Sequence, residues 1–150
     1  MFTLILFVGL NNNSVHAQYK GHHETPTELR GNWYQWDSYN HKFDKLTFNK
    51  YSVYENGKLI YGNHNHKANN HLYMYIDKLK KGYGGVNYGF NDKVTMGDPT
   101  GYWLSHKKVN GKRVLESYTN TGGFMVYTRQ KVHHNYSFTD NNNTYQKIGR

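Results

Sequence analysis

Short apolar and aromatic segments alternate with turn signals along most of this chain, and this alternation predicts β-strands joined by tight turns. The strongest signals are Asn56-Gly57 and Asn110-Gly111, because both central residues of a type I′ hairpin turn need a positive φ. Further turn signals occur at Tyr39-Asn40-His41, Gly62-Asn63, Gly84-Gly85, Asp98-Pro99-Thr100-Gly101 and Thr121-Gly122-Gly123. They separate segments of roughly six to twelve residues, which is the spacing of strands in a sandwich or barrel.

The segments between these turns have strand character to different degrees. Residues 72–76 are apolar or aromatic at every position, and residues 124–127 belong to an expected meander of the last three strands. In residues 45–55 the apolar positions move from one face to the other, and we expect a β-bulge near residues 49–50 to reconcile them. Residues 76–81 are the one helical candidate, and they are too short to affect the fold.

Composition favours strands over helices. Aromatic residues make up 17% of the chain and there are 15 glycines, a balance typical of strands and turns. We therefore predict an all-β fold, an antiparallel up-and-down β-barrel of about eight strands, with an open β-sandwich as the alternative. The barrel domain is expected at residues 31–131, between an N-terminal extension at 18–30 and a polar C-terminal tail at 132–150. The residues expected in its core are Trp33, Leu46, Phe48, Met74, Ile76, Leu104, Leu115, Phe124 and Val126.

The chain begins with features of a secretory signal peptide. Residues 2–10 form an uncharged apolar run, polar residues follow, and Ala17 supplies the small residue that signal peptidase prefers. The run is much shorter than the roughly 20 apolar residues of a membrane-spanning helix. We therefore expect residues 1–17 to be removed as a signal, which leaves no integral membrane span and places the protein outside the cell. Ordinary signals begin with Lys or Arg, and none precedes Ala17, so a start upstream of Met1 stays open.

The charge of the chain indicates which partners it attracts. Lys and Arg number 19 against 10 Asp and Glu, a formal net charge of +9, which favours polyanions. The basic residues are dispersed, with no run longer than Lys80-Lys81 and Lys107-Lys108, and this argues against nucleic acid as a partner. For an exported protein we expect an anionic cell-wall polymer, a membrane surface or an acidic polysaccharide instead. The chain has no cysteine, which is common in exported proteins of Gram-positive bacteria, and we expect a monomer.

Three residues carry a resemblance to a known family. Gly31 and Trp33 open the first expected strand, and Arg129 lies on the last one. In this the chain resembles the lipocalins and the wider calycin group, in which a Gly-x-Trp and a late Arg mark a barrel of about eight antiparallel strands. The resemblance implies that Trp33 is a structural plug beneath Arg129 at the closed end, because a guanidinium can stack on an indole while donating to nearby carbonyls. It also implies a small apolar or amphipathic ligand inside the barrel.

A second resemblance concerns the composition and the short sequence motifs of the chain after residue 17. The chain is basic, cysteine-free and rich in Tyr, Lys and Asn, and it contains short motifs such as residues 51–58. In this it resembles small uncharacterised extracellular proteins of lactobacilli and their relatives. Such short motifs are also similar to parts of the repeated cell-wall-attachment modules of S-layer proteins, although this chain has no convincing internal repeat. This resemblance implies an extracellular binding or surface role.

Ten histidines raise the question of a metal site. His64 and His66 share one face of a strand and His71 follows, so three imidazoles could meet at a zinc ion. No carboxylate or cysteine lies in residues 64–71 to complete such a site. We therefore expect solvated loop histidines and no cofactor, with His64, His66 and His71 as the alternative metal candidate.

No pattern of residues indicates a catalytic site. The carboxylates are separated in a way that fixes no acid–base pair. Ser105-His106 and Ser117 lack a nucleophile elbow, and no helix follows the glycine-rich residues 81–85 to bind a phosphate. We assign no catalytic residue and favour a non-enzymatic protein, with an extracellular enzyme of unknown class as the third alternative.

Aromatic residues are the main candidates for ligand binding. Tyr34, Trp36, Tyr102 and Trp103 could line a cavity or form an open stacking face. At the mouth of a barrel they would surround an apolar or amphipathic ligand. On a sheet surface, with lysines nearby, they would stack on sugar rings while ammonium groups meet phosphate or carboxylate. The first arrangement predicts a secreted small-molecule-binding protein, and the second a basic surface protein that adheres to anionic cell-wall polymer or polysaccharide.

Overall fold

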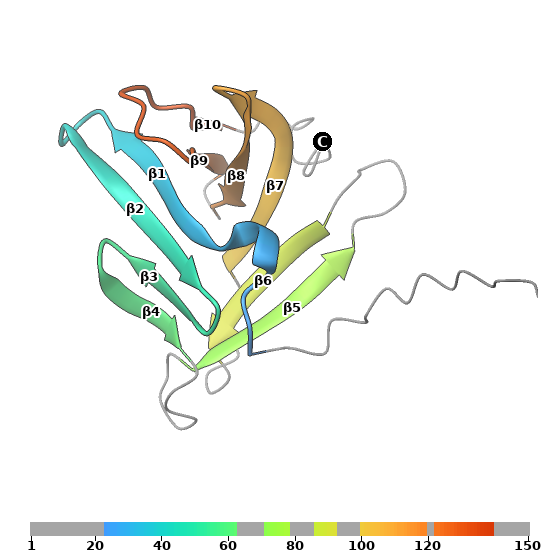
Figure 1. Ribbon diagram of the computed structural model, residues 1–150. Helices are drawn as coiled ribbons and strands as arrows, with labels where there is room; N and C mark the ends of the chain where they lie inside the picture. The colour runs from blue at the N-terminus through green and yellow to red at the C-terminus, as the bar shows by residue number, and fades with distance from the viewer. Residues whose placement is uncertain (1–22, 63–70, 79–85, 93–99, 120–121, 140–150) are drawn as a thin grey trace, which may run out of the picture.

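The structure of the protein, a computed structural model, describes residues 23–62, 71–78, 86–92, 100–119 and 122–139, and they form two antiparallel β-sheets (Figure 1). The smaller sheet has the order β1-β2-β3-β4, comprising β1 (Gly31–Asp37), β2 (Lys42–Asn49), β3 (Ser52–Glu55) and β4 (Lys58–Gly62). The larger sheet has the order β10-β9-β8-β7-β6-β5, comprising β5 (Leu72–Lys78), β6 (Val86–Asp92), β7 (Thr100–Val109), β8 (Lys112–Tyr118), β9 (Gly123–Tyr127) and β10 (Phe138–Thr139). A 3-10 turn, η1 (Thr27–Leu29), precedes β1. The all-β prediction is confirmed.

Within the described residues neither sheet closes on itself, so the structure does not show the predicted closed barrel, and the two sheets match the sandwich alternative. Two isolated bridges connect the sheets. At one edge Tyr34 and Thr128 exchange two backbone hydrogen bonds of 2.8 Å, and at the other Gly62 pairs with His71. No ladder continues from the Tyr34–Thr128 bridge along the described part of β9, where the Val126 N–H donates instead to the Ser137 hydroxyl at 3.1 Å.

Local sequence determines two of the hairpins. Asn56-Gly57 joins β3 to β4 and Asn110-Gly111 joins β7 to β8, with φ of 50° at each Asn and of 82° and 74° at the glycines. These are the positive values that the Asn-Gly pairs predict. The bulge expected near residues 49–50 is instead a turn between β2 and β3, which pairs Phe48 with Val53. A turn changes which side chains face the core just as a bulge would, and it leaves Tyr51 exposed.

The core lies between the two sheets and contains most of the residues that the sequence predicts. Trp33, Leu46, Phe48, Met74 and Leu115 are buried in the main cluster, and Ile76 and Leu104 pack against it half-buried. Phe124 and Val126 are also buried, but Phe124 belongs to a second cluster with Trp103. The main cluster also contains residues that the pattern does not single out: Leu29, Val53, Leu72, Phe90, Tyr102 and Tyr127.

Trp33 is fixed from two sides at one end of the core. The Arg129 guanidinium carbon lies 3.6 Å from the centroid of the Trp33 ring, and the indole Nε1 donates to the Leu29 carbonyl at 2.7 Å. Arg129 also donates from its two terminal nitrogens to the carbonyls of Arg30 and Glu28, at 2.7 and 2.9 Å. The guanidinium therefore stacks on the ring and binds the chain that leads into β1.

Gly31 is required where this contact forms. Its φ is +103°, which side chains other than hydrogen rarely allow. A Cβ atom at this position would lie 3.0 Å from an Arg129 nitrogen. The glycine thus lets the backbone pass close beside the guanidinium.

The folded part extends beyond the boundaries predicted at residues 31 and 131. Leu29, from the expected extension, is fully buried, and the Thr25 N–H donates to the Lys50 carbonyl at 2.8 Å. Residues 132–139, from the expected tail, return along the larger sheet and end in β10 (Figure 1). The expected signal at residues 1–17 lies outside the described residues, as do residues 140–150. Within the part of the chain that is described, no helix is long and apolar enough to cross a membrane.

The returning segment buries the outer face of the larger sheet, which points away from the smaller sheet. Phe138 stacks on Phe124, with ring centroids 4.9 Å apart and an interplanar angle of 10°. The Ser137 hydroxyl accepts hydrogen bonds from the Val126 N–H at 3.1 Å and from Gln35 Nε2 at 2.7 Å. The larger sheet is therefore covered on both faces around β9, and this explains why Phe124 and Val126 are buried away from the main cluster.

A carboxyl group is buried on this outer face. Glu116 is 5% exposed, accepts a hydrogen bond from Trp103 Nε1 at 3.2 Å and lies 3.9 Å from the Lys107 ammonium. Burial raises the pKa of Glu116, although Lys107, Ser105 and Trp103 oppose the shift. The folded protein therefore holds a proton on this group more readily than the unfolded chain does.

We expect Trp33→Ala to cost about 3–5 kcal/mol of unfolding free energy, because it removes a fully buried ring. The control Trp36→Ala, on the other face of β1, should cost about 1 kcal/mol. Urea unfolding followed by circular dichroism measures both. Equal losses, or a larger loss for Trp36→Ala, would contradict the assignment of Trp33 as the structural residue.

We expect Glu116→Gln to become more stable relative to the parent protein as the pH rises from about 4 to about 7. The raised pKa of Glu116 means that its contribution to stability is complete below the pKa of the unfolded chain and is lost as the pH rises through the folded-state pKa. Urea unfolding at several pH values gives the difference in unfolding free energy between the two proteins. A difference that stays constant with pH would contradict the burial of this carboxyl.

Candidate functional site

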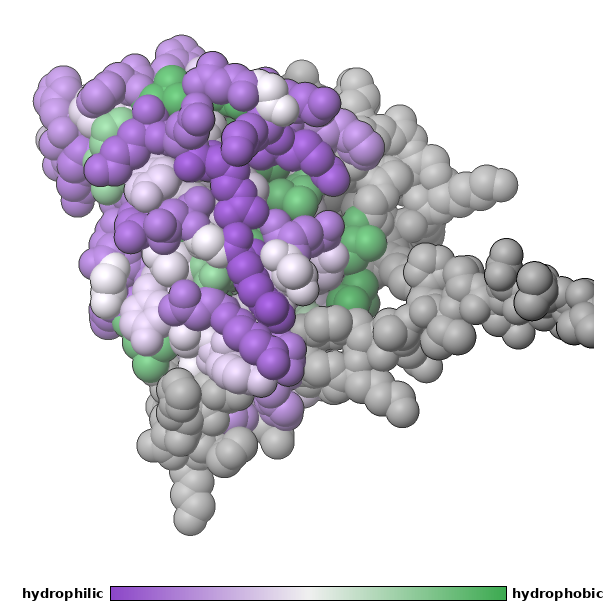
Figure 2. Space-filling view, in the orientation of Figure 1, coloured by the Kyte–Doolittle hydropathy of each residue, from purple (hydrophilic) through white to green (hydrophobic). Residues whose placement is uncertain are grey.

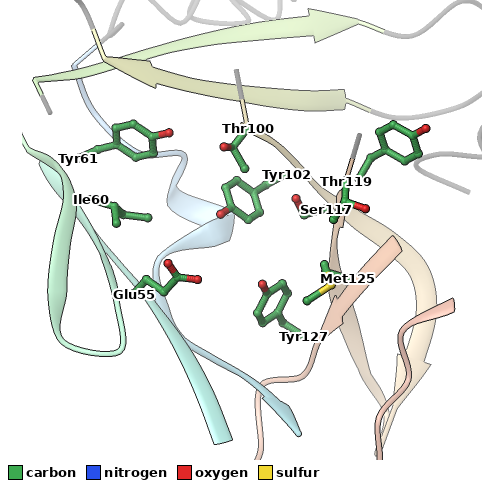
Figure 3. A pocket seen from close by; sticks show the side chains of 10 residues that line it. Glu55, Ile60, Tyr61, Thr100, Tyr102, Ser117, Thr119, Met125 and Tyr127 are labelled. Carbon is green, nitrogen blue, oxygen red and sulfur yellow. The ribbon is translucent and has the colours of Figure 1, made fainter. Parts of the chain in front are cut away.

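A pocket of about 440 Å³ lies between the two sheets (Figure 3). Strands β3 and β4 form one wall, and β7, β8 and β9 form the other. The residues that line it are Glu55, Ile60, Tyr61, Thr100, Tyr102, Ser117, Tyr118, Thr119, Met125 and Tyr127. The pocket is thus built from segments that are far apart in the sequence.

Strand register aligns one row of the wall. Tyr102 on β7 pairs with Ser117 on β8, and Ser117 pairs with Met125 on β9. Paired residues on neighbouring strands share a face of the sheet, so these three side chains point into the pocket together. Tyr127 follows Met125 by two residues and therefore points the same way.

Tyr102 lies deepest among the pocket tyrosines. It is 5% exposed, and its ring packs edge-on against Phe48 and Phe90, with centroids 5.3 and 5.6 Å away. Figure 3 shows the Tyr102 and Tyr127 side chains on one wall and Glu55 on the other, around the same space. Aromatic packing therefore holds Tyr102 in place while leaving the phenol at the pocket.

Two of the tyrosines that line the pocket, Tyr102 and Tyr127, are protonated over the physiological pH range. Burial is the main reason that the pKa of Tyr102 lies well above its ordinary value, and the neighbouring Tyr127, Tyr61 and Glu55 add to the shift. Burial likewise raises the pKa of Tyr127, with further contributions from the carboxylates of Glu55 and Asp44. These phenols can therefore donate hydrogen bonds to a ligand, and neither acts as a base.

Of the four aromatic residues predicted to bind a ligand, only Tyr102 lines this pocket. Trp103 follows Tyr102 on the same strand and so points to the outer face, where it is buried against Phe124. Tyr34 and Trp36 lie on the face of β1 opposite Trp33 and are half-buried. The structure therefore does not bring these four side chains together, because neighbours along a strand point in opposite directions, and their role in ligand binding stays a prediction.

Tyr34 and Trp36 belong instead to an outer aromatic cluster, formed with Phe43 and His133. The Trp36 ring centroid lies 4.9 Å from that of Phe43 and 4.6 Å from that of His133, and Phe43 and His133 are also 4.9 Å apart. The Lys131 ammonium lies 5.5 Å from the Phe43 ring and 5.7 Å from the Tyr34 ring. This cluster combines aromatic faces with an exposed cation on the surface of the smaller sheet.

The histidines of the metal candidate are only partly described. His64 and His66 lie outside the described residues. His71 is fully buried, and its ring centroid lies 5.2 Å from that of His23. His23 Nδ1 lies 2.9 Å from the Leu72 carbonyl oxygen. In the described part of the chain, no three His, Cys, Asp or Glu side chains come together in a way that could hold a metal ion.

Sequence reasoning missed most of the residues in the pocket wall. Met125 and Tyr127 alternate with Phe124 and Val126, so the pattern does reveal two faces on β9. Both faces are apolar, because the sheet is covered on both sides, and the sequence offers no signal for which one faces the pocket. The sequence also gives no signal that Glu55 is a neighbour of these residues.

Comparison of the chain with protein families, with curated proteins and with solved structures found no match.

Proposed function

We propose that this protein is a non-enzymatic binding protein that holds a small amphipathic molecule in the pocket between its sheets. The observation that carries this proposal is the pocket itself. Its volume of about 440 Å³ falls within the range of about 300–1,000 Å³ that is typical of small-molecule sites. The barrel-like binding mode of lipocalins is not needed, since two sheets joined at their edges can enclose a ligand as well.

The lining supports an amphipathic rather than a purely apolar ligand. Ile60, Met125 and the tyrosine rings offer apolar contact area. Hydroxyl groups of Ser117 and Thr100 and the phenol of Tyr102 offer hydrogen bonds. A ligand with an apolar body and a polar end would use both kinds of surface.

The proposed place of action is outside the cell or at the surface of a Gram-positive bacterium. Support comes from residues 1–17, whose apolar run and small residue at Ala17 are typical of a secretory signal. The absence of cysteine from the chain agrees with such a protein.

We expect the pocket to bind members of a library of small aromatic fragments, and Thr100→Phe to weaken this binding at least about tenfold by filling the space. Amide shifts in nitrogen-15 NMR spectra should concentrate at Tyr102, Ser117 and Met125. The control Thr47→Phe, on the outer side of β2, should leave binding unchanged. Shifts confined to the outer surface of β1 and β2, or equal effects of the two variants, would contradict the proposal.

A second candidate function is adhesion to an anionic cell-wall polymer or polysaccharide. The outer aromatic cluster favours it, because the accessible parts of its half-buried rings can stack on sugars while the exposed Lys131 meets phosphate or carboxylate groups. The net charge of +9 acts in the same direction. Figure 2 shows this view of the protein as largely hydrophilic, with hydrophobic residues in small separate patches, which suits a hydrated polymer.

We expect the protein to be retained on purified Gram-positive cell walls at low salt and to be released as the ionic strength rises to about 1 M. Trp36→Ala should weaken retention several-fold, because Trp36 is central to the outer aromatic cluster. Tyr39→Ala is the matched control, since Tyr39 is 91% exposed outside the cluster. Retention that changes neither with salt nor with Trp36→Ala would contradict adhesion by this surface.

A further inference from the structure

The charge of the pocket is opposite to that of the protein. The chain has a formal net charge of +9, from 19 Lys and Arg against 10 Asp and Glu, and it contains 10 histidines besides. The residues that line the pocket include one carboxylate, Glu55, and no Lys, Arg or His. Among the described residues that line the pocket, the only formal charge is therefore negative.

Glu55 is placed to face a ligand. It is the last residue of β3 and pairs with Leu46, a core residue, so its side chain is on the inner face of the smaller sheet. Its other cross-strand neighbour is Lys58 on β4, but no cation of the described residues lies within 4.0 Å of the Glu55 carboxylate. The carboxylate is exposed at the pocket and available to a ligand.

Three tyrosines complete this environment. Tyr61, Tyr102 and Tyr127 line the pocket from both sheets, and the faces of aromatic rings attract cations. Burial is the main reason that the pKa values of Tyr102 and Tyr127 are raised, and the Glu55 carboxylate adds to both shifts because its negative potential disfavours a phenolate. The same potential stabilises a positive charge placed there.

We propose that the ligand of this pocket is a small organic cation, an amine or quaternary ammonium group attached to an apolar body. This inference rests on the proposed function, since it names the chemical class of the ligand for the same site. The ammonium group lies between the Glu55 carboxylate and the tyrosine rings, and the apolar body packs toward Ile60 and Met125. A divalent metal ion fits less well, because calcium takes about six to eight oxygen ligands, usually including several carboxylates.

The test uses three compounds that share one phenyl ring: phenethylamine, phenethyl alcohol and 3-phenylpropionate. Isothermal titration calorimetry should give the amine about tenfold higher affinity than the alcohol, and the carboxylate the lowest affinity. Glu55→Gln should lower the affinity for the amine by about five- to tenfold and leave the alcohol unchanged. Because Glu55 is exposed, the preference for the amine should also shrink as salt is added.

The matched control is Glu24→Gln, which removes a carboxylate that pairs with Arg30 and Lys50 outside the pocket. It should leave the affinity for all three compounds unchanged. If the alcohol or the carboxylate binds the pocket as tightly as the amine does, and Glu55→Gln has no effect, the cation inference fails while the small-molecule site stands. If the fragment library finds no ligand in the pocket at all, the proposed function itself fails.

Discussion

The contact between Arg129 and Trp33 joins the first strand of the smaller sheet to the chain that leaves β9 of the larger one, and the arrangement of the two sheets depends on it. One guanidinium covers the indole face and binds two carbonyls of the chain that enters β1. Beside it, the paired hydrogen bonds of Tyr34 and Thr128 connect the edges of the sheets. Loss of this junction would leave the sheets connected at the Gly62–His71 bridge and through the core, and the pocket between them would lose its fixed width.

The edge of β9 explains why the sheets remain separate. Its first residues pair with β10, the Val126 N–H donates to the Ser137 hydroxyl, and Thr128 beyond its end pairs with β1, so β1 and β9 share no continuous ladder. The same return of the chain covers the outer face of the larger sheet with Phe138. The first half of β7 is therefore buried on both faces, which is why the neighbours Tyr102 and Trp103 are both buried and belong to different clusters.

The protein presents two electrostatic environments. Its surface has many more cations than anions, which attracts polyanions, whereas the lining of the pocket contains one carboxylate and no cation. The two proposed ligands, a small cation and a large anionic polymer, would therefore contact different residues of this protein and would not compete. The outer aromatic cluster and the pocket lie on opposite faces of the smaller sheet, as the alternation of Trp33 and Trp36 on β1 requires.

The sequence by itself determined the features that depend on local geometry. Asn56-Gly57 and Asn110-Gly111 predict their hairpins because positive φ is a property of those residues, and the all-β class follows from the spacing of turns and the composition. Most of the expected core residues are buried, since an apolar side chain on a strand must be covered by something.

Only the tertiary structure decided what covers each one. Because side chains alternate along a strand, Tyr102 and Trp103 must face opposite ways. The alternation does not show which face meets the pocket, since residues 132–139 bury the other face. Likewise, Glu55 becomes a neighbour of Tyr102 and Tyr127 through the packing of two sheets, a contact between residues too distant in the chain for local pattern to foresee.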